Sequence, residues 1–265
     1  MSNWIEDSEI SRLNNESKGR PIEVSRELFD IIEASFKYSR MTSGAFDITA
    51  RPIVKLWGFQ GGSPKLPTDK EIASTLELVG YHRVGLDRKN LTVSLPAGMQ
   101  IDLAGIGKGY GVDRCVSILK EHGVKSALVN LSGNMYAIGS PFGREYWSIG
   151  IREPHGEEGI VGKLLLKDEA VATSGNYENF VMIEGRRYGH IVDPSTGRTV
   201  DHILAVTVIA PGALAADALS TGMFVLGPEA GAAAAEKIPG LRAVYALEDD
   251  TYEFVGDFGK KLILD

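Results

Sequence analysis

The chain has 265 residues, 43% of them hydrophobic and 24% charged, which is typical of a globular protein with a sizeable core, built as one large domain or two closely joined lobes. Its formal net charge of −7, with no evident basic stretch, argues against nucleic acid and anionic membranes as partners. The single cysteine excludes an internal disulfide and a cysteine metal cluster, and no apolar run approaches the roughly 18 residues that span a bilayer.

The N-terminal part of the chain shows two clear helix signals. Ser25 stands where it would cap an amphipathic helix that runs to about Tyr38. Thr68 and Glu71 have the spacing of a capping box, so they predict the start of a second helix, which Gly80 would close.

An aromatic-rich stretch, residues 44–59, lies between these two helices and contains Phe46, Asp47 and Trp57. Aromatic side chains beside a carboxylate can line a pocket for a flat ring. Aromatic residues are also commonly buried in a core that is followed by a turn. The residues alone leave both interpretations open.

A glycine-rich stretch, residues 101–111, leads into an amphipathic helix that ends near Gly123, with Cys115 on its apolar stripe and therefore expected in the core. Glycines before a helix let the backbone approach a ligand, and the helix N-terminus favours an anion, to which Lys108 adds positive charge. The spacing matches neither a P-loop nor the dinucleotide fingerprint, so phosphate contact and tight packing both stay open. Asp102 would repel phosphate and would suit a ribose hydroxyl, a ring N–H or a metal-bound water.

The middle of the chain alternates in the manner of strands. Hairpins are predicted around residues 87–90, 184–187 and 249–250, and further strands at 126–131, 147–151, 162–166 and 206–209. Residues 172–177 predict a polar loop. Hairpins interspersed with single helices indicate an α+β fold with antiparallel sheets.

His190 precedes the turn pattern Asp193-Pro194 with Gly197, in which Asp193 is expected to be structural. His190 itself could act as a base, contact a phosphate or be a satisfied histidine, and its neighbours alone favour the last of these.

Residues 213–222 predict a helix of small and apolar residues, followed by a break at Gly227 and a second helix from Pro228. Asp217 and Thr221 are four residues apart and therefore share one helical face. A carboxylate and a hydroxyl placed in this way provide half of a hard-cation site of the magnesium type. The alternative is a buried helix in which the Asp caps and the Thr bonds back to the backbone.

Taken together, these segments resemble the ApbE family of flavin transferases. The matching stretches, in the family's order, are residues 7–14, 44–49 with 56–59, 102–110, 173–177, 190–197 and 216–221. Each stretch is weak alone, whereas all of them in order cover nearly the whole chain. The resemblance implies a single domain over residues 1–265 with an ApbE-like (T-fold-like) architecture of antiparallel sheets packed with helices.

The resemblance also implies a reaction. FAD is cleaved at its pyrophosphate, FMN is joined through a phosphoester to a Thr or Ser of a target flavoprotein of the redox-pump subunit type, and AMP leaves. Mg²⁺ is required. Two other readings stay open: an Mg²⁺-dependent FAD pyrophosphatase that gives FMN and AMP, and a non-catalytic FAD-binding protein.

Site residues carry over by their motifs. The resemblance implies a metal site made of Asp217, Thr221 and the carbonyl of Gly105. His190 or Asp217 would serve as the base, and the sequence does not choose between them. The implied FAD contacts are Trp4, Ala45, Phe46, Asp47, Asp102, Lys108 and Ile191.

The chain departs from the family's pattern at its start. Family members usually begin with a signal peptide, often of the lipoprotein kind, and then a strand carrying Met-Gly-Thr that touches the flavin. The polar residues 1–7 form no signal peptide. We therefore expect the domain to lack that strand, while the resemblance implies an extracytoplasmic or membrane-anchored lipoprotein.

Overall fold

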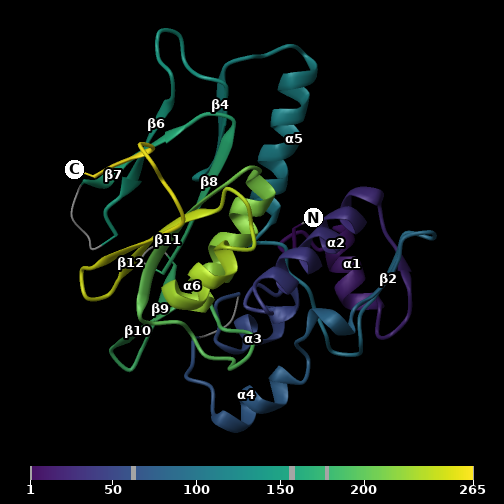
Figure 1. The fold of residues 1–265 in the computed structure, drawn as a ribbon. Helices are drawn as coiled ribbons and strands as arrows, with labels where there is room; N and C mark the ends of the chain where they lie inside the picture. Colours follow the sequence, from purple (N-terminus) through teal and green to yellow (C-terminus); the bar gives the residue numbers. More distant parts are fainter. Residues whose placement is uncertain (1, 61–63, 155–158, 177–178, 265) are drawn as a thin grey trace. The chain divides into compact units, whose positions relative to one another are not determined.

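The computed structural model describes residues 2–60, 64–154, 159–176 and 179–264. The chain divides into two compact units, each assembled from two separate segments (Figure 1). Unit 1 comprises Met1–Gly107 and Asn179–Val200, and unit 2 comprises Lys108–Glu178 and Asp201–Asp265. The single domain expected from the resemblance stays a prediction.

Where the structure describes it, unit 1 consists of short helices and two small antiparallel sheets, with strand orders β1-β3-β2 and β10-β9. Its elements are α1 (Glu9–Glu16), β1 (Ile22–Glu23), α2 (Arg26–Met41), the 3-10 helix η1 (Ile48–Ala50), α3 (Arg51–Leu56), α4 (Asp69–Leu76), the 3-10 helix η2 (Tyr81–Arg83), β2 (Gly85–Asp87), β3 (Thr92–Ser94), β9 (Phe180–Ile183) and β10 (Arg186–Gly189).

The predicted helix starts in unit 1 are confirmed by their caps. The Ser25 hydroxyl accepts a hydrogen bond from the Leu28 N–H at 3.2 Å. Thr68 and Glu71 form the full capping box, with each side chain bonded to the other residue's backbone N–H. Helix α4 ends at Leu76, four residues before the glycine expected to close it.

The core of unit 1 is built around Trp57, whose side chain is only 2% exposed. It packs with Ile53 of α3 and with Val192, and Tyr188 of β10 lies against its ring with centroids 5.3 Å apart. The Trp57 indole N–H donates to the carbonyl of Gly197 at 2.9 Å. Trp57 is therefore a core residue, as one of the two interpretations of the aromatic stretch predicted.

The described residues of unit 2 form two antiparallel sheets and two long helices. Its elements are α5 (Gly107–Glu121), β4 (Ala127–Leu131), β5 (Asn134–Ile138), β6 (Trp147–Arg152), β7 (Ile160–Leu166), β8 (Glu169–Gly175), β11 (Ile203–Ala210), α6 (Ala213–Ala235), β12 (Arg242–Leu247), β13 (Tyr252–Val255) and β14 (Leu262–Leu264). The larger sheet has the order β13-β12-β11-β8-β5-β4, and the smaller one has the order β14-β7-β6.

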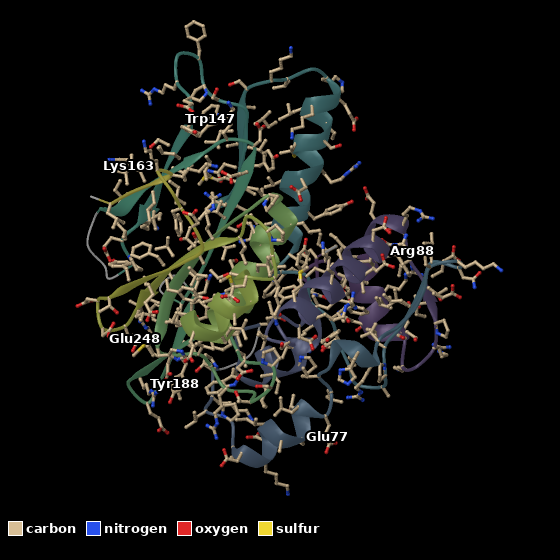
Figure 2. All side chains as sticks on the ribbon, viewed as in Figure 1. Glu77, Arg88, Trp147, Lys163, Tyr188 and Glu248 are labelled. Carbon is tan, nitrogen blue, oxygen red and sulfur yellow. The ribbon has the colours of Figure 1, made fainter. Side chains whose placement is uncertain are left out.

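Unit 2 is layered. Helix α6 packs on strands β8 and β11 at the centre of the larger sheet (Figure 1). The opposite face of that sheet buries Val171 and Ile209 against Ile149 and Leu164 of the smaller sheet. Trp147, labelled in Figure 2, donates its indole N–H to the carbonyl of Ile138 at 3.3 Å. Because β11 is covered on both faces, its near-continuous apolar run is buried at every position.

Two expectations for unit 2 were wrong. Residues 172–175 are not loop but the end of β8, which pairs with β11 because Ala172 and its neighbours are buried in the sheet; residue 177 lies outside the described residues. Cys115 is exposed, since the buried face of α5 is a narrow stripe through Gly109, Val112 and Val116.

The other predictions for unit 2 are confirmed. Gly227, with φ of 76°, interrupts α6, and Pro228 follows it as the start of a second helical segment. The strand pairs of both units are antiparallel, so the α+β fold class is confirmed. Among the described residues, no helix combines the length and hydropathy that crossing a bilayer requires.

Candidate functional site

Asp217 and Thr221 lie on one face of α6, as their spacing predicted. The Asp217 side chain is buried, with only 4% exposed, and its Oδ2 accepts a hydrogen bond from the Gly109 N–H at 2.8 Å. Gly109 belongs to the first turn of α5, where unpaired N–H groups and the helix dipole favour a negative charge. The capping role considered for Asp217 is therefore present.

Burial dominates the electrostatics of Asp217 and raises the pKa of its carboxyl above the usual range. The Gly109 N–H, the positive charge of Lys108 and the Asn134 amide oppose that rise. The carboxylate thus lies where a positively charged partner would stabilise its ionised form, and this is the setting that a cation site requires.

A second acidic residue mirrors this arrangement. Asp113 of α5 accepts hydrogen bonds from the backbone N–H groups of Ala213 at 2.8 Å and Leu214 at 2.9 Å, which open α6. Each helix therefore supplies the carboxylate that caps the other helix. The N-cap of α6 is Gly212, which has no side chain to do this itself.

The two helix starts meet at Gly109. A Cβ added there would stand 2.3 Å from the carbonyl oxygen of Ala213 and 2.8 Å from Cβ of Asp217. These distances are too short for any side chain, so the close approach of α5 to α6 requires glycine. Tight packing, one of the two readings of the glycine-rich stretch, is therefore present at this position.

Hydroxyl and amide groups surround Asp217 and Thr221. The Ser220 hydroxyl donates to the carbonyl of Asp217 at 2.8 Å, and Ser174 of β8 lies 2.8 Å from Ser220 Oγ and 3.3 Å from Thr221 Oγ1. Asn134 of β5 is 1% exposed, and its side-chain amide is one of the groups that act on the Asp217 carboxyl. Unit 2 thus gathers hydroxyl groups and one buried amide around a buried carboxylate.

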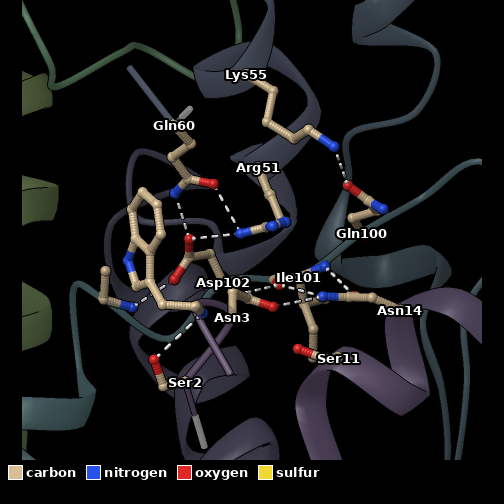
Figure 3. Close-up of polar contacts among 12 residues, drawn as sticks. Ser2, Asn3, Ser11, Asn14, Arg51, Lys55, Gln60, Gln100, Ile101 and Asp102 are labelled. Carbon is tan, nitrogen blue, oxygen red and sulfur yellow. Dashed lines mark hydrogen bonds and ion pairs between the residues drawn. The ribbon is translucent and has the colours of Figure 1, made fainter. Parts of the chain in front are cut away.

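In unit 1, Asp102 lies in a polar network (Figure 3). Its Oδ2 accepts from the Gln60 amide and from Arg51 Nη1 at 3.2 Å, and its Oδ1 accepts from the Ala104 N–H at 2.8 Å. Arg51 also donates to Gln60 Oε1 at 2.7 Å. The sequence drew no attention to Arg51 or Gln60, because no local pattern links them to residue 102.

Trp4 is brought to the same part of unit 1 by its neighbour in the chain. Asn14 bonds both backbone groups of Ile101, at 2.8 and 2.9 Å, and also holds Asn3 at 2.9 Å (Figure 3). Asn3 in turn donates to the Ile101 carbonyl at 3.2 Å. Trp4, the next residue, is 76% exposed, so a broad aromatic face is available beside the segment that carries Asp102.

The segment with Ala45, Phe46 and Asp47 runs past the same place, since the Asp102 N–H donates to the Ile48 carbonyl at 2.8 Å. Ala45 is half-buried, whereas the Phe46 ring is only 3% exposed and faces the core. Its N–H donates to the Thr42 hydroxyl at 3.0 Å, so Phe46 is held within the core of unit 1.

Asp47 is engaged in the fold. It accepts hydrogen bonds from the N–H and hydroxyl of Thr49 and from the N–H of Tyr81, at 2.7 to 2.9 Å. Burial raises the pKa of its carboxyl, and these hydrogen bonds oppose the rise. Asp47 thus caps η1 and binds the first residue of η2.

His190 and Ile191 follow β10 in unit 1. The His190 Nδ1 lies 3.0 Å from the carbonyl oxygen of Asn179. A carbonyl oxygen can only accept, so Nδ1 is the donor in this contact. Ile191 is buried and accepts a backbone hydrogen bond from Val200 at 3.1 Å. Asp193 binds Ser195 and Thr196 within its turn, so its predicted structural role is confirmed.

A model of the ApbE family matches residues 1–245. The chain belongs to the ApbE family. Curated relatives named FAD:protein FMN transferase come from Vibrio cholerae, at 34% identity over 92% of this chain and 75% of the relative, and from Haemophilus influenzae, at 35% identity over 89% of this chain and 71% of the relative.

Solved structures agree with this membership. The ApbE protein of Thermotoga maritima is 36% identical and superposes with a TM-score of 0.89, covering 96% of this chain and 83% of that one. The flavinyl transferase ApbE of Pseudomonas stutzeri is 33% identical with a TM-score of 0.84, covering 98% of this chain and 81% of that one. The ApbE-like architecture expected from the sequence is therefore confirmed.

Of the predicted metal ligands, Asp217 and Thr221 belong to unit 2, and Gly105 belongs to unit 1 in the turn before α5. Sequence reasoning missed the groups that act on Asp217 and on the rest of α6: Gly109 and Asn134 at Asp217, Asp113 at the start of α6, and Ser174 at Thr221. Ser174 stood inside one of the matching stretches, but only the pairing of β8 beside α6 shows what it contacts.

Proposed function

We propose that this ApbE-family chain is an Mg²⁺-dependent FAD:protein FMN transferase that attaches FMN through a phosphoester to a Thr or Ser of a target flavoprotein and releases AMP. The observation that carries the proposal is the buried Asp217 carboxylate with Thr221 one helical turn away, in a chain about a third identical to proteins of that name. The redox-pump type of target is carried over from the family.

The ligands at Asp217 suit magnesium. Mg²⁺ prefers oxygen ligands and commonly uses one or two carboxylates together with substrate phosphates. The groups next to Asp217 and Thr221 are the hydroxyls of Ser174 and Ser220, which are oxygen donors like those that a hard cation prefers. The Gly105 carbonyl remains part of the proposal through the resemblance.

Transfer of a phosphoryl-type group depends mainly on positioning and on neutralising charge. Bound Mg²⁺ would supply Lewis-acid polarisation of the pyrophosphate. Lys108, at the start of α5, would neutralise phosphate charge. A Thr hydroxyl is a weak nucleophile, so a general base is needed, and His190 or Asp217 would serve as that base.

The test mixes purified protein with FAD and Mg²⁺, with and without a peptide bearing an acceptor Thr, and follows the products by mass spectrometry. The proposal expects flavinylated peptide and AMP only when FAD, Mg²⁺ and peptide are all present, and no reaction with EDTA. FMN and AMP in the presence of peptide, without flavinylation, would make the chain a pyrophosphatase. Unchanged FAD in every mixture would leave only binding.

We expect Trp4→Ala to weaken FAD binding by roughly tenfold, since stacking of an aromatic base is worth about 1–3 kcal/mol. Trp4 is widely exposed beside the Asp102 network, which suits an aromatic side chain that covers the isoalloxazine ring. Calorimetry with FAD measures the effect, and Trp4→Phe, which keeps a ring, should lose less. Equal affinity for FAD in the wild type and Trp4→Ala would place the flavin elsewhere.

We expect Lys108→Ala to lower the affinity for FAD several-fold while leaving that for riboflavin nearly unchanged, because riboflavin carries no phosphate. The reason is the position of Lys108 in the first turn of α5, where a positive side chain and the positive end of the helix dipole favour an anion. Parallel titrations of the two ligands decide the matter. Equal losses for both would mean that this turn serves packing alone.

A further inference from the structure

Three hydroxyl groups in unit 2, those of Thr221, Ser174 and Ser220, form a hydrogen-bonded series. Ser220 Oγ lies 2.8 Å from the carbonyl oxygen of Asp217, Ser174 Oγ lies 2.8 Å from Ser220 Oγ, and Thr221 Oγ1 lies 3.3 Å from Ser174 Oγ. Ser174 comes from β8, and the other two come from α6. The interaction therefore joins the helix that carries the proposed metal ligands to the sheet beneath it.

The direction of each hydrogen bond follows from counting protons. The carbonyl of Asp217 can only accept, so the single proton of Ser220 is used there. Ser174 must then donate to Ser220, which uses the single proton of Ser174. The remaining contact requires Thr221 to donate to Ser174. The hydroxyls thus run in one direction, from Thr221 to Ser174 to Ser220 to the backbone.

This direction matters for a hydroxyl that binds a cation. A hydroxyl ligand presents a lone pair to the ion, so its proton must point away and find an acceptor. Ser174 is the acceptor for Thr221. We propose that Ser174 is a positioning residue that holds the Thr221 hydroxyl with its lone pairs free for Mg²⁺; this rests on the metal site of the proposed function.

Partners of this kind contribute strongly to metal binding. Loss of a group that orients a ligand typically lowers metal affinity by about 10–100-fold. We therefore expect Ser174→Ala to lower the affinity for Mg²⁺ about tenfold. Ser174→Thr keeps an acceptor hydroxyl and should recover most of that loss. Ser220→Ala should also weaken Mg²⁺ binding, because the Ser174 proton is then free to turn toward Thr221 and displace the Thr221 proton from its acceptor.

The same strand provides a matched control. Thr173, next to Ser174, points to the opposite face of the sheet, where its hydroxyl lies 2.9 Å from that of Thr207. Thr173→Val removes a hydroxyl from β8 without changing the hydrogen-bonded hydroxyls of Thr221, Ser174 and Ser220. It should leave Mg²⁺ affinity at the wild-type level.

The experiment titrates Mg²⁺ into the full-length variants by calorimetry and, separately, measures the Mg²⁺ concentration that gives half-maximal AMP release. The proposal is supported if Ser174→Ala raises both the Mg²⁺ dissociation constant and the half-maximal Mg²⁺ concentration about tenfold. Ser174→Thr should then bring both values back toward those of the wild type, and saturating Mg²⁺ should restore the activity of Ser174→Ala. One outcome would overturn the role of Ser174 but keep the metal site: folded Ser174→Ala and Ser220→Ala bind Mg²⁺ as the wild type does, whereas Asp217→Ala no longer binds it. If Asp217→Ala binds Mg²⁺ like the wild type, the metal site of the proposed function falls as well. Should Ser174→Ala not fold, Ser220→Ala carries the same test.

Discussion

Asp217→Ala is expected to abolish Mg²⁺-dependent cleavage of FAD and transfer of FMN. The carboxylate supplies most of the charge attraction for a hard cation, whereas the Thr221 hydroxyl supplies mainly geometry. Thr221→Val should therefore lower activity less, and excess Mg²⁺ should partly restore it. AMP release titrated with Mg²⁺ measures both variants, and binding of FAD to Asp217→Ala should persist.

Asp113→Ala is a matched control that separates Mg²⁺ binding by Asp217 from its role as a helix cap. Asp217 caps α5 through Gly109, and Asp113 caps α6 through Ala213 and Leu214, so both substitutions remove a helix cap worth about 1 kcal/mol. Asp113→Ala should lower the melting temperature yet keep the activity of the folded fraction. A folded Asp217→Ala enzyme with wild-type activity would reduce Asp217 to the same capping role.

Gly109→Ala is expected to destabilise the protein by about 2–3 kcal/mol and to lower Mg²⁺ affinity together with stability. The added Cβ would stand 2.3 Å from the Ala213 carbonyl, and a backbone atom can move away only if one helix shifts. That shift would displace Asp217, whose Cβ is 2.8 Å from the same point. Thermal unfolding and Mg²⁺ calorimetry on one sample measure both effects.

Gly111→Ala is the control for this steric argument. It adds the same methyl group to the same helix, but the nearest atom is a methyl of Leu131 at 3.2 Å, on a side chain that can rotate. Its stability should stay close to that of the wild type. Equal destabilisation of both variants would mean that helix α5 tolerates no change at its start, and that the contact with Ala213 has no special importance.

Local patterns predicted much of the fold. The Thr68–Glu71 capping box, the turn at Asp193 and the break at Gly227 each depend on groups a few residues apart, and the structure confirms all three. Residues 172–175 were missed for the opposite reason. Their polar side chains suggest a loop, whereas their pairing with β11, some 30 residues away, places them in a sheet.

In the candidate site too, features that depend on nearby residues were predicted, and contacts between distant residues were not. Spacing along one helix was enough to put Asp217 and Thr221 on one face. Nothing near Asp102 in the sequence pointed to Arg51, and nothing near Asp217 pointed to Gly109. Contacts between residues so far apart depend on how the elements pack, which propensity and periodicity do not describe.

The exchange of caps between α5 and α6 couples their folding. The first turn of each helix lacks its carboxylate until the other has docked, and the bonded residues are separated by 100 or more positions in the chain. The segment between them includes β4, β5, β8 and β11, which are neighbours in the larger sheet, so we expect the helix ends to meet only when these strands are paired. The two helix starts therefore belong to one cooperative folding unit, and their local opening reports on the integrity of the sheet beneath them. A substitution deep in that sheet, far from Asp217, would reduce the population of chains with an ordered carboxylate.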